Sequence, residues 1–215
     1  MANVTIGHVA DMVIEQLQDS GYDNWTEQAL VNWGNLGSRQ IVAFAPDANM
    51  VIGSVKLAQG VKQSIGAPGI AVRSVLRNMG ADGNTPGQAI LMTSIELLTA
   101  FSTAWPTETE VSVISDAAID PRHPTQFFVF PPSDGTSYVE VERSEAPPAI
   151  VWDAGGAWRN AAVGISNAYI GALVDYILAR AYGQDSDFPG NEQRKIAHYQ
   201  QFLQATGVAT TTQQQ

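Results

Sequence analysis

Residues 165–205 read ISNAYIGALVDYILARAYGQDSDFPGNEQRKIAHYQQFLQA, and we interpret them as two helices joined by a short polar turn. In the first helix, apolar side chains recur at steps of three and four residues, the period of one helical face. These residues are Ile165, Ala168, Tyr169, Ala172, Leu173, Tyr176 and Ile177. Ile170, Val174 and Leu178 widen this face. A helix that is apolar on most sides must be covered by other helices or by another subunit.

The polar turn between these two helices carries residues typical of helix ends. Gly183 suits the C-cap of the first helix, Ser186 or Asp187 the N-cap of the second, and Pro189 an early helical position. In the second helix, one side is apolar and the other is charged. The apolar side consists of Ile196, Tyr199, Phe202 and Leu203. We expect this helix pair to serve packing or assembly.

Composition limits the classes of partner. The chain has 215 residues and a formal net charge of −10, with no basic cluster, so phosphates of bare nucleic acid would be repelled and protein partners are favoured. It has no cysteine, which excludes disulfides, thiolate metal sites and cysteine nucleophiles. The first residues do not resemble a signal peptide, and no apolar run approaches the roughly 20 residues that span a membrane. We expect no membrane partner.

Residues 5–44 predict two further helices. The first helix is capped by Thr5 and runs to about Asp19. The second helix begins near Asn24 and ends before Pro46, and Asn24 forms a capping-box pattern with Glu27.

Two glycines, Gly34 and Gly37, lie inside the second of these helices. Each costs roughly 1 kcal/mol relative to alanine in a helix. They are either a tolerated weakness or places where a neighbouring helix approaches closely.

From Met50 the apolar period changes. Residues 50–66 and 70–80 are β-branched and interrupted by glycine, which indicates strands and turns. Residues 85–90 resemble another short strand, and residues 90–103 a short helix. Phe127–Phe130 and Tyr138–Arg143 predict a hairpin with one solvated face.

The predicted fold class is α+β, because the strands are grouped and do not alternate with helices. Residues 1–48 and 150–206 are expected to form one helical domain, a bundle built from both chain ends. Residues 49–149 are expected to form an inserted β-rich domain, either a sandwich or a barrel-like unit. Residues 207–215 have no apolar period and are expected to form an extended C-terminal tail.

Catalytic and metal-binding patterns were sought and none was assigned. The three histidines, His8, His123 and His198, have no ligand spacing. His123 near Asp120 could be drawn as a base with an orienting acid, but no nucleophile or oxyanion motif accompanies the pair. Ser166 is one residue from a nucleophile-elbow pattern, yet it lies in a helical stretch. No phosphate-binding glycine loop or HExxH is present. We therefore predict no catalytic, cofactor or metal residues and no enzyme activity.

The remaining candidates are the aromatic residues of the helices. They either fill the helical core or face a neighbouring subunit, since aromatic side chains are enriched in interfaces. The candidates for subunit packing are Tyr169, Leu173, Tyr176, Tyr199 and Phe202.

A resemblance becomes specific at residues 180–203, RAYGQDSDFPGNEQRKIAHYQQFL, which resemble the C-terminal helical signature of tailed-phage head–tail connector (adaptor) proteins. Three further segments are similar to that family in the same order: residues 25–48, 55–80 and 120–148. Together they cover most of residues 22–206. The chain departs from the family pattern at Gly66-Ala67-Pro68, which follows Ile65.

The resemblance implies a structural role in the virion, at the head–tail junction, after assembly in the cytoplasm of the host bacterium. Proteins of this kind form a ring, typically of about twelve copies with head-to-tail contacts that close by rotation. The ring docks beneath the portal and receives a downstream neck or tail protein, and DNA passes through its lumen without sequence-specific binding. The tail that would bind the portal is Gly207, Val208, Ala209, Thr210, Thr211, Thr212, Gln213, Gln214 and Gln215.

Two alternatives remain open on the sequence. One is another neck protein, a tail terminator or stopper, which would bind the tail tube and not the portal. The other is a small virion hydrolase, which would depend on His123.

Overall fold

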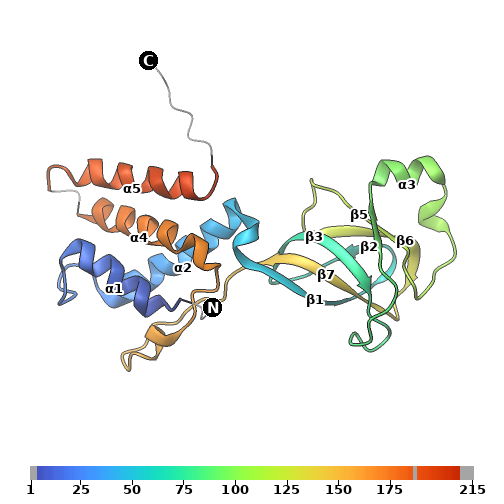
Figure 1. Ribbon diagram of the computed structural model, residues 1–215, viewed down its shortest axis with the longest axis horizontal. Coiled ribbons are helices and arrows are strands. Elements are labelled where there is room, and N and C mark those ends of the chain that lie inside the picture. The colour runs from blue at the N-terminus through green and yellow to red at the C-terminus, as the bar shows by residue number, and fades with distance from the viewer. Residues whose placement is uncertain (1–3, 186–187, 209–215) are drawn as a thin grey trace, which may run out of the picture. The chain divides into compact units, whose positions relative to one another are not determined.

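The computed structural model describes residues 4–185 and 188–208 (Figure 1). The fold is α+β, with helices at both ends of the chain and strands grouped in the middle, as the sequence predicts. The described residues fall into two compact units. The helical unit takes its residues from Met1–Asn49 and Pro147–Gln215, and the β unit is Met50–Ala146.

The helical unit is organised around α4, which contacts each of the other three α-helices of that unit. The α-helices are α1 (Ile6–Leu17), α2 (Glu27–Phe44), α4 (Ile170–Gln184) and α5 (Asn191–Ala205), and the 3-10 turns are η1 (Pro46–Asn49), η3 (Ala157–Asn160) and η4 (Asn167–Tyr169). Leu173, Ile177 and Leu178 of α4 are fully buried. The broad apolar face that the sequence shows in α4 is therefore covered largely within one chain.

The predicted N-cap of α2 at Asn24 is wrong. The hydroxyl oxygen of Thr26 accepts from the backbone N–H of Ala29 at 3.3 Å and caps the helix. The backbone N–H groups of residues 23–25 instead donate to the carboxylate of Asp19, each at 3.1 Å. Because Asp19 already holds this turn, Asn24 belongs to the loop and the helix starts at Glu27.

The ends of α4 and α5 also differ from the prediction. Gly183 lies inside α4, whose C-cap is Asp185, and Pro189 precedes α5. The N-cap of α5 is Gly190, whose φ of 106° is in the region that favours glycine. The amide of Asn191 donates to the backbone oxygen of Asp185 at 2.8 Å, which joins the two helix ends. The other predicted caps, Ser186 and Asp187, lie outside the described residues.

The first part of the predicted C-terminal helix is not α-helical. Ile165 lies in the segment before η4, and the hydroxyl oxygen of Ser166 accepts from the backbone N–H of Ala168 at 3.4 Å, which caps this 3-10 turn. The α-helical hydrogen bonds begin only at Ile170. The serine of the elbow-like pattern therefore caps a turn, and does not stand at the end of a strand.

Gly34 and Gly37 lie where other helices touch α2. A methyl group built on Gly37 would stand 2.6 Å from Cδ1 of Leu173 and 2.7 Å from Cδ1 of Tyr176, both on α4. A methyl group on Gly34 would stand 2.6 Å from Cδ1 of Ile6 on α1. The structure thus supports the second interpretation of these glycines, close approach of neighbouring helices.

This packing predicts opposite effects for two glycine substitutions. Gly37→Ala should lower the free energy of unfolding by about 1–3 kcal/mol, because overpacking of a filled core costs that much. A methyl group built on Gly171 of α4 would meet no heavy atom within 4 Å beyond its chain neighbours and the backbone of its own helix. Gly171→Ala should therefore raise stability by about 0.4–1 kcal/mol. Urea unfolding of both variants checks this, and a Gly37→Ala protein as stable as Gly171→Ala would contradict it.

The β unit contains two sheets. The strands are β1 (Met50–Lys56), β2 (Gln59–Ser64), β3 (Gly69–Asn78), β4 (Leu91–Thr93), β5 (Asp116–Ile119), β6 (Gln126–Asp134) and β7 (Tyr138–Glu145). Their orders are β1-β7-β3 and β2-β6-β5-β4. Both sheets contribute to one apolar core, in which Phe127 and Val129 of β6 meet the cluster containing Val139 and Val141 of β7.

The helix α3 (Ile95–Phe101) and the turn η2 (Trp105–Thr107) pack on a second, smaller cluster of the β unit. Leu98 and Trp105 are buried there with Ala118, and the ring of Trp105 meets Phe128 edge-on at 6.2 Å. Phe127 and Phe128 therefore serve clusters on opposite faces of the same strand, as the alternation along β6 requires.

The predicted hairpin of residues 127–143 is wrong. β6 pairs with β2 and β5, whereas β7 pairs with β1 and β3, so the turn after Asp134 carries the chain from one sheet to the other. The alternation of Val139 and Val141 with Glu140 and Glu142 is present, but it reflects a face buried between sheets.

Two local expectations between residues 85 and 103 also need correction. Residues 85–90 do not form the predicted strand; Ala89 makes an isolated bridge with Arg77, and the strand β4 begins only at Leu91. The predicted helix of residues 90–103 is shorter in the structure, where α3 starts at Ile95. Ser94 is its N-cap, because the Ser94 hydroxyl oxygen accepts from the backbone N–H of Leu97 at 3.1 Å.

Candidate docking surfaces

The carboxylate of Asp120 is bound to Arg122 and does not orient His123. The guanidinium of Arg122 donates to Oδ1 at 2.9 Å and to Oδ2 at 3.0 Å of Asp120. These hydrogen bonds lower the pKa of the Asp120 carboxyl below its ordinary value. His123 meets Asp120 through its own backbone N–H, which donates to the Asp120 backbone oxygen at 2.9 Å. The geometry gives no acid–imidazole pair at this turn.

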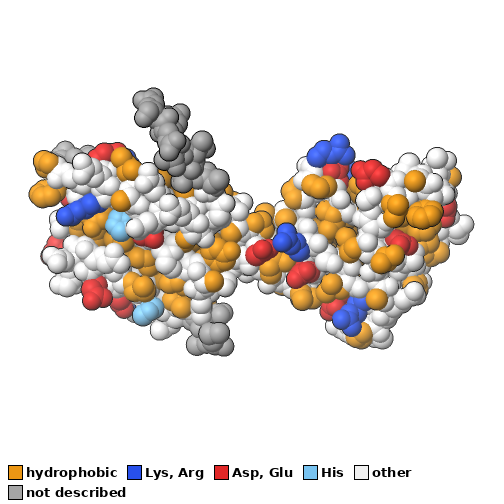
Figure 2. Space-filling view, turned by 45° about the horizontal axis from the view of Figure 1, so that its top comes forward, with side chains coloured by type: hydrophobic (Ala, Val, Ile, Leu, Met, Phe, Trp, Pro, Cys, Tyr) orange, Lys and Arg blue, Asp and Glu red, His pale blue; other side chains and the backbone are white. Residues whose placement is uncertain are grey.

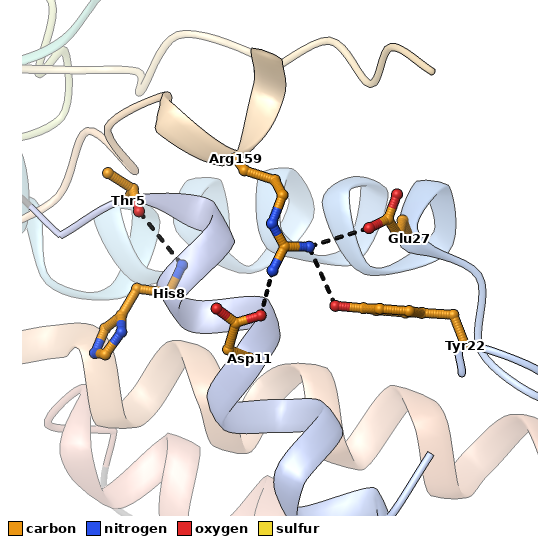
Figure 3. Close-up of polar contacts among 6 residues, drawn as sticks. All are labelled: Thr5, His8, Asp11, Tyr22, Glu27 and Arg159. Carbon is orange, nitrogen blue, oxygen red and sulfur yellow. Dashed lines mark hydrogen bonds and ion pairs between the residues drawn. The ribbon is translucent and has the colours of Figure 1, made fainter. Parts of the chain in front are cut away.

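A polar cluster around Arg159 joins η3 to the first two helices (Figure 3). The guanidinium donates to the Tyr22 hydroxyl at 3.2 Å and to the Glu27 carboxylate at 3.0 Å, and it also contacts Asp11. The hydrogen bond with Tyr22, followed by that with Asp11, raises the pKa of the Arg159 guanidinium, which stays charged. The cluster holds segments distant in sequence together, because its guanidinium engages all three side chains.

His8 lies beside this cluster but is not part of its network. Figure 3 shows that the contact drawn for His8 runs from its backbone N–H to the Thr5 hydroxyl, the N-terminal cap of α1.

His198 links α5 to α4. Its Nδ1 lies 2.8 Å from Oδ1 of Asp175, and its ring stacks on Tyr182 with centroids 5.7 Å apart and planes 13° from parallel. The guanidinium carbon of Arg194 lies 5.5 Å from the centre of the Tyr182 ring. The histidine therefore has a structural partner on each side.

Within residues 4–185 and 188–208, no group of three His, Cys, Asp or Glu side chains is placed to hold a metal ion. Among the described helices, none has both the length and the apolar character that a membrane span requires.

The structure separates the five candidates for subunit packing by their exposure, which the sequence leaves undivided. Leu173, Tyr176 and Phe202 are at most 2% exposed, whereas Tyr199 is 40% exposed and Tyr169 is half-buried. The Phe202 ring lies at the centre of a cluster, 5.2 Å from the Tyr176 ring and 5.8 Å from the Tyr199 ring. In the single chain, Tyr199 is thus the candidate with the largest free surface.

Tyr199 forms one wall of an open hollow of about 400 Å³ between α4 and α5. The hollow is lined by Tyr176, Ala179, Arg180, Lys195, Ile196, Tyr199 and Gln200. Ala179, Arg180 and Lys195 also line a second hollow, which extends to Trp33 and Gly183. We call this continuous depression the α4–α5 groove.

The α4–α5 groove combines apolar walls with two cations. The side chain of Ile196 is 47% exposed, so its surface is available to a partner. The guanidinium of Arg180 donates to the Tyr176 hydroxyl from Nε at 3.2 Å and from Nη2 at 2.9 Å, which holds it along the groove. Lys195 pairs with Glu192 at 3.2 Å, and an exposed pair of this kind contributes little and is easily exchanged.

The β unit presents an apolar surface of its own. On α3, Phe101 is 83% exposed and Leu97 is 50% exposed, and on β4, Leu91 is 67% exposed and Met92 is 36% exposed. Leu97 and Phe101 lie four positions apart on one helical face, and we call these two residues the α3 surface. Figure 2 shows hydrophobic side chains on the visible surfaces of both units. Exposed apolar groups that gather in one place are typical of protein interaction sites.

The chain leaves α5 through a short capped turn. The hydroxyl of Thr206 donates to the Phe202 backbone oxygen at 3.0 Å, and the backbone N–H of Val208 donates to the Leu203 oxygen at 3.0 Å. Gly207 and Val208, the first two residues of the predicted tail, belong to this turn. Residues 209–215 lie outside the described residues.

A family model described as SU10 adaptor protein matches residues 4–215, and the chain therefore belongs to this family of structural phage adaptor proteins. The match confirms the resemblance to phage head–tail adaptors and identifies the protein as a virion component. No curated protein sequence matches the chain.

Proposed function

We propose that this protein is a head–tail connector that forms a ring of about twelve copies, closed by head-to-tail contacts between subunits. The ring would dock beneath the portal and receive the next neck or tail protein. The observation that carries the proposal is the adaptor family match over residues 4–215, which includes both units and the C-terminal tail.

The charge of the chain supports passage of DNA through such a ring. The formal net charge is −10, with 21 acidic and 11 basic residues. A lumen wall with this excess of acid would repel the phosphates, so that DNA moves without adhering to it. Sequence-specific contacts with DNA are not part of the proposal.

We assign portal binding to residues 207–215. The segment is neutral and rich in threonine and glutamine, whose side chains supply both donors and acceptors. An extended backbone can also pair with a strand or lie in a groove of a partner. The tail starts within the turn that ends α5, where the Thr206 hydroxyl donates to the Phe202 backbone oxygen and the Val208 backbone N–H to the Leu203 oxygen.

Deletion of residues 207–215 should leave the fold intact and abolish portal binding. The deletion removes the backbone N–H groups of Gly207 and Val208 that cap the end of α5, so the circular dichroism spectrum should be unchanged and the melting temperature should fall by about 4 °C at most. Binding is measured by co-sedimentation with purified portal. A variant that carries a Gly-Ser segment of equal length separates the effect of tail sequence from that of tail length.

Retention of full portal binding by the deletion variant would show that the tail is not the anchor. Binding of the intact protein to tail tube, and none to portal, would instead favour a tail terminator.

A further inference from the structure

We propose that the α3 surface of one copy docks into the α4–α5 groove of a neighbouring copy. The inference rests on the proposed ring, because it names the contact that would join adjacent subunits. The occupant of the groove is thus a second copy of this chain. Each surface is complete within its own unit, so the inference needs no contact between the two units of one chain.

Both surfaces present exposed apolar side chains. Leu97 and Phe101 are four positions apart on α3, which places both side chains on one face of the helix. They are 50% and 83% exposed, whereas Leu98 between them is buried against the β unit. A pair of apolar side chains on one helical face is how helices bind apolar grooves, and the groove offers Ile196 and Tyr199 as walls.

The charges of the two surfaces are opposite. The groove carries Arg180 and Lys195. Around α3 acidic groups outnumber basic ones: residues 78–121 contain no lysine or arginine, and Arg122, the cation that acts on Glu96, is itself paired with Asp120 at 2.9 Å. The same stretch contains Glu96, adjacent to Leu97, and Glu108. Hydrogen bonds with its own backbone N–H and with Ser94 lower the pKa of the Glu96 carboxyl, which favours its charged form.

These complementary charges favour contact between the α3 surface of one copy and the α4–α5 groove of another. Two α3 surfaces would bring carboxylates together, and two grooves would bring cations together, so each surface disfavours a copy of itself. A contact between two different patches of the same chain is heterologous, and repeated around an axis it produces a ring. One docking event per subunit is therefore enough to propagate the assembly.

Single-thiol cross-linking tests the pairing, because the natural chain contains no cysteine. Phe101→Cys and Ile196→Cys are purified separately, mixed at high concentration with and without portal, and treated with a short bismaleimide. The mixture should yield a cross-linked dimer that neither variant yields alone. Val151→Cys is the matched control for Ile196→Cys, since Val151 is a 79% exposed residue of the helical unit that does not line the groove.

Absence of the Phe101–Ile196 dimer under both conditions, or equal cross-linking of Phe101→Cys to Val151→Cys, would overturn the inference. A second test uses Phe101→Asp and Ile196→Asp. Each variant should lose self-association in analytical ultracentrifugation, and their mixture should form a heterodimer and nothing larger, because only one intact contact remains. Larger assemblies in the mixture would contradict a single heterologous contact.

The outcome is separable from that of the proposed function. Portal binding through residues 207–215 is measured with the same variants, and Phe101→Asp leaves that tail untouched. Portal binding without cross-linking would reject this contact and retain the connector proposal. Cross-linking with no portal binding would retain this contact and reject the connector proposal.

Discussion

Tyr176→Ala is expected to lower the free energy of unfolding by about 3–5 kcal/mol, the usual cost of truncating a large buried aromatic side chain to alanine. Tyr176 is 2% exposed, and its ring lies 5.2 Å from that of Phe202. It also lies against Gly37, where α2 approaches α4 so closely that a methyl group would collide with the ring. Removal of the ring therefore opens a cavity that three helices share.

Urea unfolding monitored by circular dichroism measures this loss. Tyr199→Ala is the matched control, because Tyr199 belongs to the same aromatic cluster but is 40% exposed. The control should change the free energy of unfolding by about 1 kcal/mol or less, as surface substitutions usually do. An unchanged unfolding midpoint for Tyr176→Ala would show that Tyr176 does not support the core.

Phe127→Ala is expected to have an effect of similar size, about 3–5 kcal/mol, on the β unit. Phe127 is fully buried and belongs to the core that both sheets share. Its removal leaves a void between β6 and the strands of the other sheet. We propose that the two units have separate cores, so the loss should concentrate in the β unit.

Hydrogen exchange followed by mass spectrometry resolves the two units. Phe127→Ala should accelerate exchange in β6 and β7 and leave α4 protected. Phe101→Ala serves as the control, because Phe101 is 83% exposed and its truncation should change stability by about 0.5 kcal/mol or less. Equal loss of protection in α4 would contradict the proposal of separate cores.

Much of the architecture follows from patterns within single segments. The three- and four-residue apolar steps around Leu173 and Tyr176 predict α4, and the β-branched, glycine-interrupted residues from Met50 predict the strands. The predicted cap at Thr5 is confirmed, since its hydroxyl accepts from the backbone N–H of His8 at 3.3 Å. The α+β class is predicted because the strands are grouped between helices at both ends of the chain.

The sequence did not predict how the strands pair. Residues 127–143 show the alternation expected of a hairpin, but β6 and β7 lie in different sheets. Alternation records only that one face of a strand is buried, and a face buried between two sheets leaves the same pattern. The four-residue strand β5, with Ala117 and Ala118 fully buried, was missed because small residues give little periodic signal.

The sequence likewise did not predict the α3 surface or the α4–α5 groove. Tyr176 and Tyr199 are both aromatic residues on apolar helical faces, and their spacing gives no reason to treat them differently. Most of the helices and strands follow from the sequence, because helix and strand preferences depend mainly on neighbours within a few residues. Only the packing of the helices shows that Tyr176 is 2% exposed whereas Tyr199 is 40% exposed. Burial depends on which distant helix covers each side chain, here α2 approaching α4 at Gly37.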